Sequence, residues 1–155
     1  MELILWRHAH AIDGGPDLAD LERPLSPKGV KQAARMAQWL DARLPENCKI
    51  LVSPAKRTLQ TVAPLMRKYK VLPELGPEAN PLHLLEAANW PNSRECVLIV
   101  GHQPTLGRLI ATLVQGQDQE FELRKGYICW ISQREREGKL QTWIKALLGA
   151  EMCAK

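Results

Sequence analysis

The chain of 155 residues has no long hydrophobic run. No stretch approaches the roughly 18 apolar residues that a membrane-spanning helix requires. Its start, Met1-Glu2 followed by a short apolar run over 3–6, differs from a secretory signal, which has a basic start and a longer apolar segment. We therefore expect a cytoplasmic protein that does not associate with membranes.

Metal and disulfide motifs are also missing. No CxxC pair occurs among the four cysteines, and no cluster of carboxylates and histidines has the spacing of a metal site. The cysteines are Cys48, Cys96, Cys129 and Cys153. We expect free thiols of a reducing compartment, no bound metal and no cofactor.

Aromatic residues make up only 5% of the chain, and the excess of positive charge is small, with 21 basic and 17 acidic residues. The basic residues are scattered along the sequence, and none forms a stripe interleaved with aromatic residues of the kind that stacks nucleobases. These features argue against a nucleic-acid partner. A pI near 9.0 mildly favours anionic ligands such as phosphates or an acidic protein surface.

The sequence has the composition of an ordinary globular protein, 45% hydrophobic and 25% charged, and its length suits one domain spanning 1–155. Apolar segments predict strands at 2–6, 49–52, 71–72 and 96–100, with a closing hairpin at 127–132 and 140–145. Helical spacing follows Pro27, Pro54, Pro81 and Pro104. This alternation predicts an α/β fold, a three-layer α/β/α sandwich with a mostly parallel central sheet.

Two of the predicted helices share a start signal. Ser26-Pro27 and Ser53-Pro54 each read as an N-cap serine followed by a proline in the first helical position. The first helix is expected to run over 27–43. In the second helix, Pro64 is expected to kink or interrupt the backbone.

Basic side chains follow the three best strands. The first strand ends in Arg7-His8, the second leads to Arg57 in the first turn of its helix, and the third leads to His102. Ligands of parallel α/β sheets lie beyond the carboxyl ends of the strands, so two imidazoles and two guanidiniums should surround one crevice. Taken singly, each of these residues is more often an exposed loop residue, but the joint pattern favours a site.

Such a set suits phosphoryl transfer. Guanidinium groups bind phosphate oxygens in a fork and stay charged. A neutral imidazole can attack phosphorus and form a covalent phosphoenzyme, while a second, cationic imidazole neutralises charge on the oxygens. No metal is required if these residues supply the positive charge.

Four segments resemble a known family. WRHAHA at 6–11 resembles the RHG/RHA signature of the histidine phosphatase superfamily, the phosphoglycerate-mutase-like proteins. SPAKRTLQT at 53–61 resembles its SPxxRxxQT segment, and Gly101-His102 matches its second histidine. ERPLSPKG at 22–29 looks like the RPLTPKG stretch of the short SixA-type phosphohistidine phosphatases. The resemblance implies a phosphoglycerate-mutase-like fold.

The resemblance also implies a role for each matching residue. His8 would be the nucleophile that becomes phosphorylated, Arg7 and Arg57 would hold the phosphoryl oxygens, and His102 would complete the pocket. One departure from the pattern is Ala9, which replaces the usual glycine.

Two further residues near these motifs are candidates for substrate binding. His10 is expected at the rim of the crevice. Ser53 either contributes its hydroxyl to the site or, in the interpretation we favour, caps the second helix.

The general acid is the least defined part of the predicted site. Mutase-like members use a carboxylic acid between the second helix and the second histidine, where Glu74 and Glu78 are candidates and His83 is a less favoured one. We slightly favour the alternative that both glutamates are ordinary surface residues. A phosphoramidate leaves readily once protonated, so the lack of a dedicated acid would fit a phosphohistidine substrate.

Three functions remain open from the sequence. The leading one is a metal-independent phosphatase that works through a phosphohistidine intermediate and dephosphorylates a phosphohistidine-bearing domain of a signalling protein. The second keeps the chemistry and takes a small phosphomonoester or sugar phosphate. The third is a degenerate phosphate-binding module, against which the four intact pocket residues argue.

Overall fold

A computed structural model of the chain describes residues 1–154. It contains one six-stranded sheet with the strand order β3-β2-β4-β1-β5-β6. The first four strands in this order pair in parallel, and the last two pairings, β1 with β5 and β5 with β6, are antiparallel. The strands are β1 (Glu2–Arg7), β2 (Lys49–Val52), β3 (Lys70–Val71), β4 (Val97–Gly101), β5 (Ile128–Arg136) and β6 (Lys139–Leu148).

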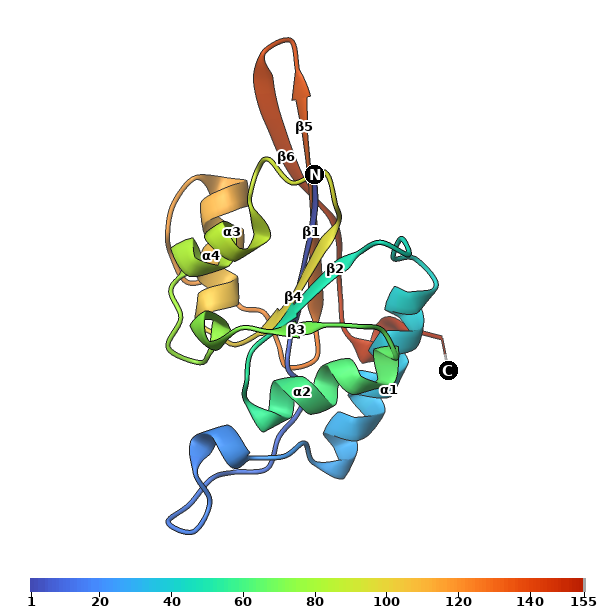
Figure 1. Cartoon of the computed structure of the whole chain (residues 1–155), viewed down its shortest axis with the longest axis vertical. Helices are drawn as coiled ribbons and strands as arrows, with labels where there is room; N and C mark the ends of the chain where they lie inside the picture. The colour runs from blue at the N-terminus through green and yellow to red at the C-terminus, as the bar shows by residue number, and fades with distance from the viewer. Residues whose placement is uncertain (155) are drawn as a thin grey trace.

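Helices cover both faces of the sheet (Figure 1). Two lie on one face, α1 (Pro27–Asp41) and α2 (Lys56–Val62), and two on the other, α3 (Pro81–Ala88) and α4 (Thr105–Gln115). Short 3₁₀ turns are η1 (Asp20–Glu22), η2 (Ala63–Leu65), η3 (Pro73–Leu75) and η4 (Ala150–Met152). The predicted three-layer α/β/α sandwich is confirmed.

The central strands are buried on both faces because their side chains alternate between two apolar cores. On β1, Ile4 and Trp6 pack in the core beneath α1 and α2. Leu3 and Leu5 pack in the core beneath α3 and α4. A strand that supplies both cores needs an uninterrupted apolar run, which is why the predicted strands were readable from the sequence.

Of the two serine–proline start signals, only the first caps a helix. The Ser26 hydroxyl accepts a hydrogen bond from the Gly29 backbone N–H at 3.1 Å, as expected of an N-cap. The predicted N-cap role of Ser53 is wrong, because α2 begins at Lys56 with Ala55 in the N-cap position. β2 ends at Val52, as predicted, and the Ser53 backbone N–H donates to the Val100 carbonyl at 3.1 Å directly after it.

Two other predictions concern the interruption of the second helix and the length of the closing hairpin. The interruption expected at Pro64 is confirmed, since α2 ends at Val62 and continues as the 3₁₀ turn η2. The hairpin extends further than expected, because its outer half is polar and exposed and carries no hydrophobic signal. This outer half projects from the body of the molecule (Figure 1).

The four cysteines are free thiols, and Cys48 and Cys96 approach to 3.5 Å between their sulfur atoms. Within residues 1–154, no helix is both long enough and apolar enough to cross a membrane.

Gly29 is required where α1 passes the loop that follows β1. A Cβ atom built at Gly29 would lie 1.9 Å from the His10 carbonyl oxygen, a backbone atom that cannot move without moving the loop. We predict that Gly29→Ala lowers the free energy of unfolding by about 1–3 kcal/mol, as other overpacked sites do. Urea denaturation measures this. Gly15→Ala, where a Cβ meets nothing within 4 Å, is the control, and an equal effect of the two substitutions would contradict the steric argument.

Candidate active site

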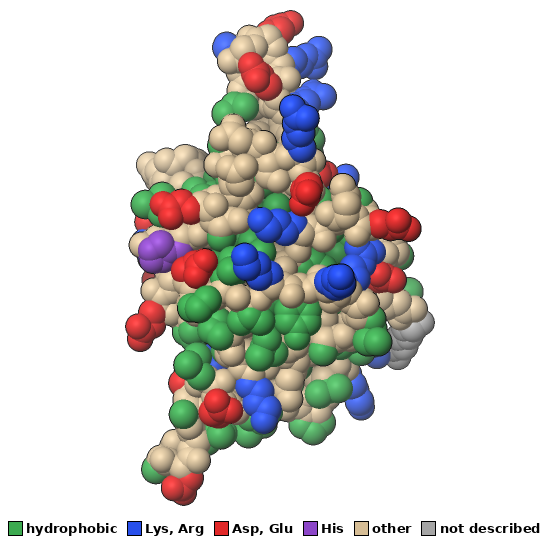
Figure 2. Space-filling model, in the orientation of Figure 1, with side chains coloured by type: hydrophobic (Ala, Val, Ile, Leu, Met, Phe, Trp, Pro, Cys, Tyr) green, Lys and Arg blue, Asp and Glu red, His purple; other side chains and the backbone are tan. Residues whose placement is uncertain are grey.

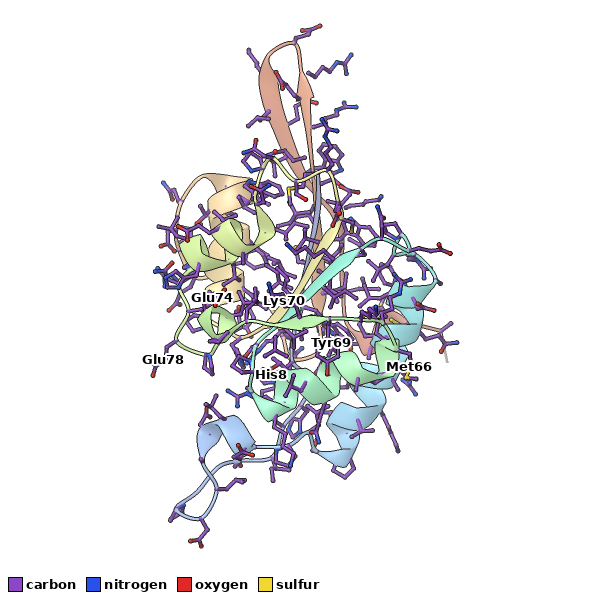
Figure 3. The ribbon with its side chains drawn as sticks, in the orientation of Figure 1. His8, Met66, Tyr69, Lys70, Glu74 and Glu78 are labelled. Carbon is purple, nitrogen blue, oxygen red and sulfur yellow. The ribbon has the colours of Figure 1, made fainter. Side chains whose placement is uncertain are left out.

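The register of the parallel strands brings the two histidines together. Arg7 pairs with Gly101, and the His8 backbone N–H donates to the Gly101 carbonyl at 3.1 Å, so His8 and His102 leave the sheet side by side. Their rings are buried with centroids 5.4 Å apart. Figure 3 shows His8 near the start of α2, at the carboxyl end of the strands.

The His8 ring is held in one tautomer. Its Nδ1 lies 2.8 Å from the Ala9 carbonyl oxygen, which can only accept a hydrogen bond. Nδ1 therefore carries the proton, and the lone pair is on Nε2. An imidazole whose Nδ1–H is fixed by a carbonyl presents Nε2 as a nucleophile.

Ser53 orients the second imidazole. Its hydroxyl oxygen lies 2.7 Å from His102 Nε2 and accepts a hydrogen bond from the Ala55 backbone N–H at 3.3 Å. We assign the hydroxyl as the donor to Nε2, which places the proton of neutral His102 on Nδ1. Ser53 thus contacts a predicted site residue, and its role in substrate binding stays a prediction.

The two guanidiniums are anchored by their terminal nitrogens. Arg57 donates from Nη1 to the Asp20 carbonyl at 2.7 Å and from Nη2 to the Asp20 carboxylate at 3.1 Å. Arg7 donates from Nη1 to the Leu123 carbonyl at 2.9 Å. These contacts fix each side chain, and its Nε–H has no hydrogen-bond partner.

Three buried donors have no partner. Among the described residues, the buried side-chain polar atoms without a hydrogen bond are Arg7 Nε, Arg57 Nε and His102 Nδ1. All three belong to the set predicted from the strand ends. A buried donor left unpaired costs about 1–3 kcal/mol. A tetrahedral oxyanion beside His8 could accept hydrogen bonds from these groups and remove that cost.

Burial keeps both imidazoles neutral. Burial, reinforced by the positive charges of Arg57 and Arg7, lowers the pKa of His8 to about 4 even though the hydrogen bond to Ala9 acts in the opposite direction. The pKa of His102 falls to about 3 because of its burial and the neighbouring charges of His8 and Arg57. His8 is therefore in its nucleophilic form near neutral pH. We expect His102 to gain a proton only when an anion occupies the pocket.

Three residues without a predicted role hold the loop that follows β1. The Thr61 hydroxyl accepts from the Ala9 backbone N–H at 3.0 Å and donates to the Arg57 carbonyl at 2.7 Å. The Gln60 side chain accepts from the Leu25 backbone N–H at 2.7 Å. Asp20, on the same loop, binds Arg57. The QT pair of the SPxxRxxQT segment was the available signal for Gln60 and Thr61, whereas no pattern in the sequence marked Asp20.

The backbone conformation at position 9 is compatible with Ala9, the residue that departs from the family pattern. Among the described non-glycine residues, positive φ angles occur at Met66, Asn89 and Glu137, so Ala9 is outside the left-handed region. His10 is half-buried, with Nδ1 2.6 Å from the Ser26 hydroxyl oxygen, and it lines a groove beside the site together with Arg7. The structure thus places His10 next to the crevice.

The candidate acids lie apart from the histidines. Glu74 and Glu78 are exposed, and within the described part of the chain neither has a hydrogen bond or ion pair with a site residue. Glu74 lines a separate depression with His83, and Glu78 points outward at the left edge of the molecule in the view of Figure 3. Their role in catalysis stays a prediction. Residues 1–154 contain no group of three or more His, Cys, Asp or Glu side chains placed to hold a metal ion.

Comparisons with known proteins agree on one family. Residues 3–81 match the model described as histidine phosphatase superfamily (branch 1). The phosphohistidine phosphatase SixA of Escherichia coli K12 is 32% identical over 127 residues, which cover 76% of each chain. An uncharacterized protein of Picosynechococcus sp. PCC 7002 is 32% identical over 149 residues, or 91% of this chain and 89% of the relative. A structure of the protein histidine phosphatase SixA complexed with tungstate superimposes with a TM-score of 0.72 at 25% identity, covering 97% of both chains.

Burial of the two imidazoles makes stability dependent on pH. Between about pH 6.5 and pH 4, the unfolded chain takes up protons that folded His8 and His102 do not, so the free energy of unfolding should fall as the pH is lowered. Each imidazole contributes a slope of up to about 1.4 kcal/mol per pH unit. His102→Gln retains an acceptor for Ser53 and should make the decline shallower by that amount, as measured by urea denaturation across this range. His83→Gln, at an exposed position, is the control, and parallel curves for wild type and His102→Gln would contradict the expectation.

Proposed function

The chain belongs to the histidine phosphatase superfamily, and we propose that it removes the phosphoryl group from phosphohistidine in a signalling protein, through a covalent phosphohistidine at His8. The observation that carries this proposal is the free Nε2 of His8 among three buried, unpartnered N–H donors. The relative from Escherichia coli is named a phosphohistidine phosphatase, which supports the same substrate class. Four free thiols fit the cytoplasm as its location.

The first step is an in-line displacement at phosphorus. His8 Nε2 attacks the phosphoryl group of the substrate, a new N–P bond forms, and the N–P bond of the substrate histidine breaks. Arg7 Nε and Arg57 Nε donate hydrogen bonds to the non-bridging oxygens, and His102 Nδ1 supplies a third donor. These groups are fixed before substrate arrives, so little reorganisation is needed.

The second step returns the enzyme to its starting state. Water attacks the phosphorylated His8, the N–P bond breaks, and inorganic phosphate is released. The proton on His8 Nδ1 stays in its hydrogen bond to the Ala9 carbonyl throughout. Phosphorylation of Nε2 therefore gives a cationic ring, and hydrolysis expels a neutral imidazole, which is the better leaving group.

The state of the carboxyl group beside the described site residues favours phosphohistidine over a phosphomonoester: hydrogen bonds from Arg23 and Arg57 lower the pKa of Asp20, so this carboxylate is a poor proton donor. An alkoxide leaving group needs a general acid, whereas the imidazole of phosphohistidine accepts a proton from solvent and then leaves readily. Glu74 and Glu78 make no contact with the histidines. A small phosphomonoester remains the second candidate, and the assay below compares the two.

We predict that His8→Ala abolishes turnover and leaves the fold intact. The substitution removes the nucleophile. The backbone hydrogen bonds of His8 and Ala9 remain, and the one hydrogen bond lost is that from the imidazole to the Ala9 carbonyl. Rapid quench with labelled phosphohistidine peptide should trap an acid-labile phosphoenzyme in the wild type and none in the variant. A small phosphomonoester, assayed in parallel, should be turned over more slowly. Retention of more than about a tenth of the activity in His8→Ala would exclude His8 as the nucleophile.

We also predict full activity after chelation with EDTA. Arg7 and Arg57 supply the positive charge that a metal provides in other phosphatases, and His102 adds a further hydrogen-bonding group. The measurement is the rate of phosphate release before and after dialysis against EDTA. A loss of activity that magnesium or zinc restores would move the protein to a metal-dependent mechanism.

A further inference from the structure

A second feature of the surface lies directly beside the proposed catalytic pocket. It is a groove of about 890 Å³ between the start of α1, the segment that leads into β5, and η4. Arg7 and His10 belong to its wall, so the groove opens onto the position where a phosphoryl group would be held. Most of its other side chains are exposed and long.

The groove carries the positive charge of the whole chain. Six of its lining residues are basic and two are acidic, an excess of four, which equals the excess of the full sequence, 21 basic against 17 acidic residues. The remaining residues balance, with 15 of each sign. The face seen in Figure 2 accordingly intersperses Lys and Arg with Asp and Glu. The charged residues of the groove are Arg7, Lys28, Lys31, Arg35, Arg124, Lys125, Glu122 and Glu151.

The cations of the groove are only partly neutralised by the protein itself: the pKa of Glu151 is lowered by the hydrogen bond from Tyr127 and by the nearby charges of Arg124 and Lys28. The ion pairs of the described residues involve Arg23, Arg57, Arg67, Arg108 and Lys145, and none involves a basic residue of the groove. Of the two acidic residues, Glu151 is hydrogen-bonded by the Tyr127 hydroxyl. The groove therefore presents an excess of positive charge to a ligand.

We propose that this basic groove binds acidic residues that flank the phosphohistidine of the substrate protein. The proposal rests on the proposed function, because the groove starts where the phosphoryl group would sit. The pocket around His8 would bind the phosphoryl group alone. The cations beyond the pocket would therefore bind further negative charge on the same ligand. Carboxylates next to the phosphohistidine supply that charge. Tyr127 is the one aromatic residue among the lining residues, which gives a nucleic acid little to stack on.

The binding should be electrostatic in origin. Exposed lysines and arginines attract an acidic segment over several ångströms and align it, which raises the association rate more than the strength of any one contact. The attraction weakens with salt, since the Debye length falls from about 10 Å at 0.1 M to about 3 Å at 1 M. Binding of this kind discriminates among phosphohistidine proteins by the charge around the phosphorylated residue.

The test uses two synthetic phosphohistidine peptides of equal length, one flanked by glutamates and one by glutamines. At low salt, wild-type protein should hydrolyse the glutamate peptide with a kcat/KM about tenfold higher than the glutamine peptide, mainly through KM. The double variant K28E/K31E reverses two exposed charges on α1 that lie outside the catalytic residues, and it should lose the preference. High salt should remove the preference from the wild type as well.

The matched control is R136E/K139E, which makes the same change in net charge on the β5–β6 hairpin, at the opposite end of the molecule (Figure 1). It should retain the preference for the glutamate peptide. Equal kcat/KM for both peptides in the wild type, or an equal loss in the two double variants, would overturn the proposal. So would a groove-dependent affinity for single-stranded DNA without any discrimination between the peptides.

The glutamine peptide separates this proposal from the proposed function. If His8-dependent hydrolysis of that peptide is absent, the proposed function fails, whatever the groove binds. If the glutamine peptide is hydrolysed by wild type and K28E/K31E alike and the glutamate peptide is not preferred, the function stands and the groove proposal fails.

Discussion

The burial of positive charge and unpaired donors at the carboxyl edge of the sheet is the constraint that organises this protein. Arg57 and His102 are almost completely buried, and together with Arg7 each keeps one N–H group that no described residue accepts. Such groups oppose folding, because water solvates them in the unfolded chain. The two apolar cores on either side of the sheet must offset that cost, and an oxyanion in the pocket recovers it. The hydrogen-bond donors that would bind a phosphoryl group are thus in position before the ligand arrives.

Several polar side chains have the task of keeping this arrangement rigid. Thr61 links the backbone after His8 to the helix that carries Arg57, and Gln60 ties the same helix to the end of the loop. Asp20 accepts hydrogen bonds from both terminal nitrogens of Arg57, which fixes the guanidinium, while its buried Nε–H keeps no partner. Ser53 fixes the second imidazole. Each contact removes a rotational freedom that would otherwise be lost when substrate binds.

The sequence allowed the layers, the strand ends and the four central residues to be predicted because those features depend on short-range patterns. Apolar runs bounded by Pro and Gly mark buried strands, and the parallel connections place their ends on one edge. Ser53 was misassigned for the same reason. Ser-Pro before a helix is a local N-cap signal, whereas α2 begins only at Lys56 and Ser53 lies directly after β2, where its backbone N–H donates to Val100. Asp20 could not be predicted, since its partner is 37 positions away and its loop has no periodic pattern. The concentration of charge in the groove is equally invisible in the sequence, where its members are spread from position 7 to position 151.

The separation of chemistry from recognition explains how so small a site can be selective. The proposed pocket around His8 would bind the phosphoryl group, the part that all such substrates share, and its neighbouring carboxyl, Asp20, has a lowered pKa and is a poor proton donor to a leaving group. Neither property distinguishes one phosphohistidine from another. Discrimination must then come from residues outside the pocket, and those with unbalanced charge adjoin it through Arg7 and His10. Because Lys28 and Lys31 are exposed, substitutions there would change the charge of the groove without disturbing the buried donors of the pocket.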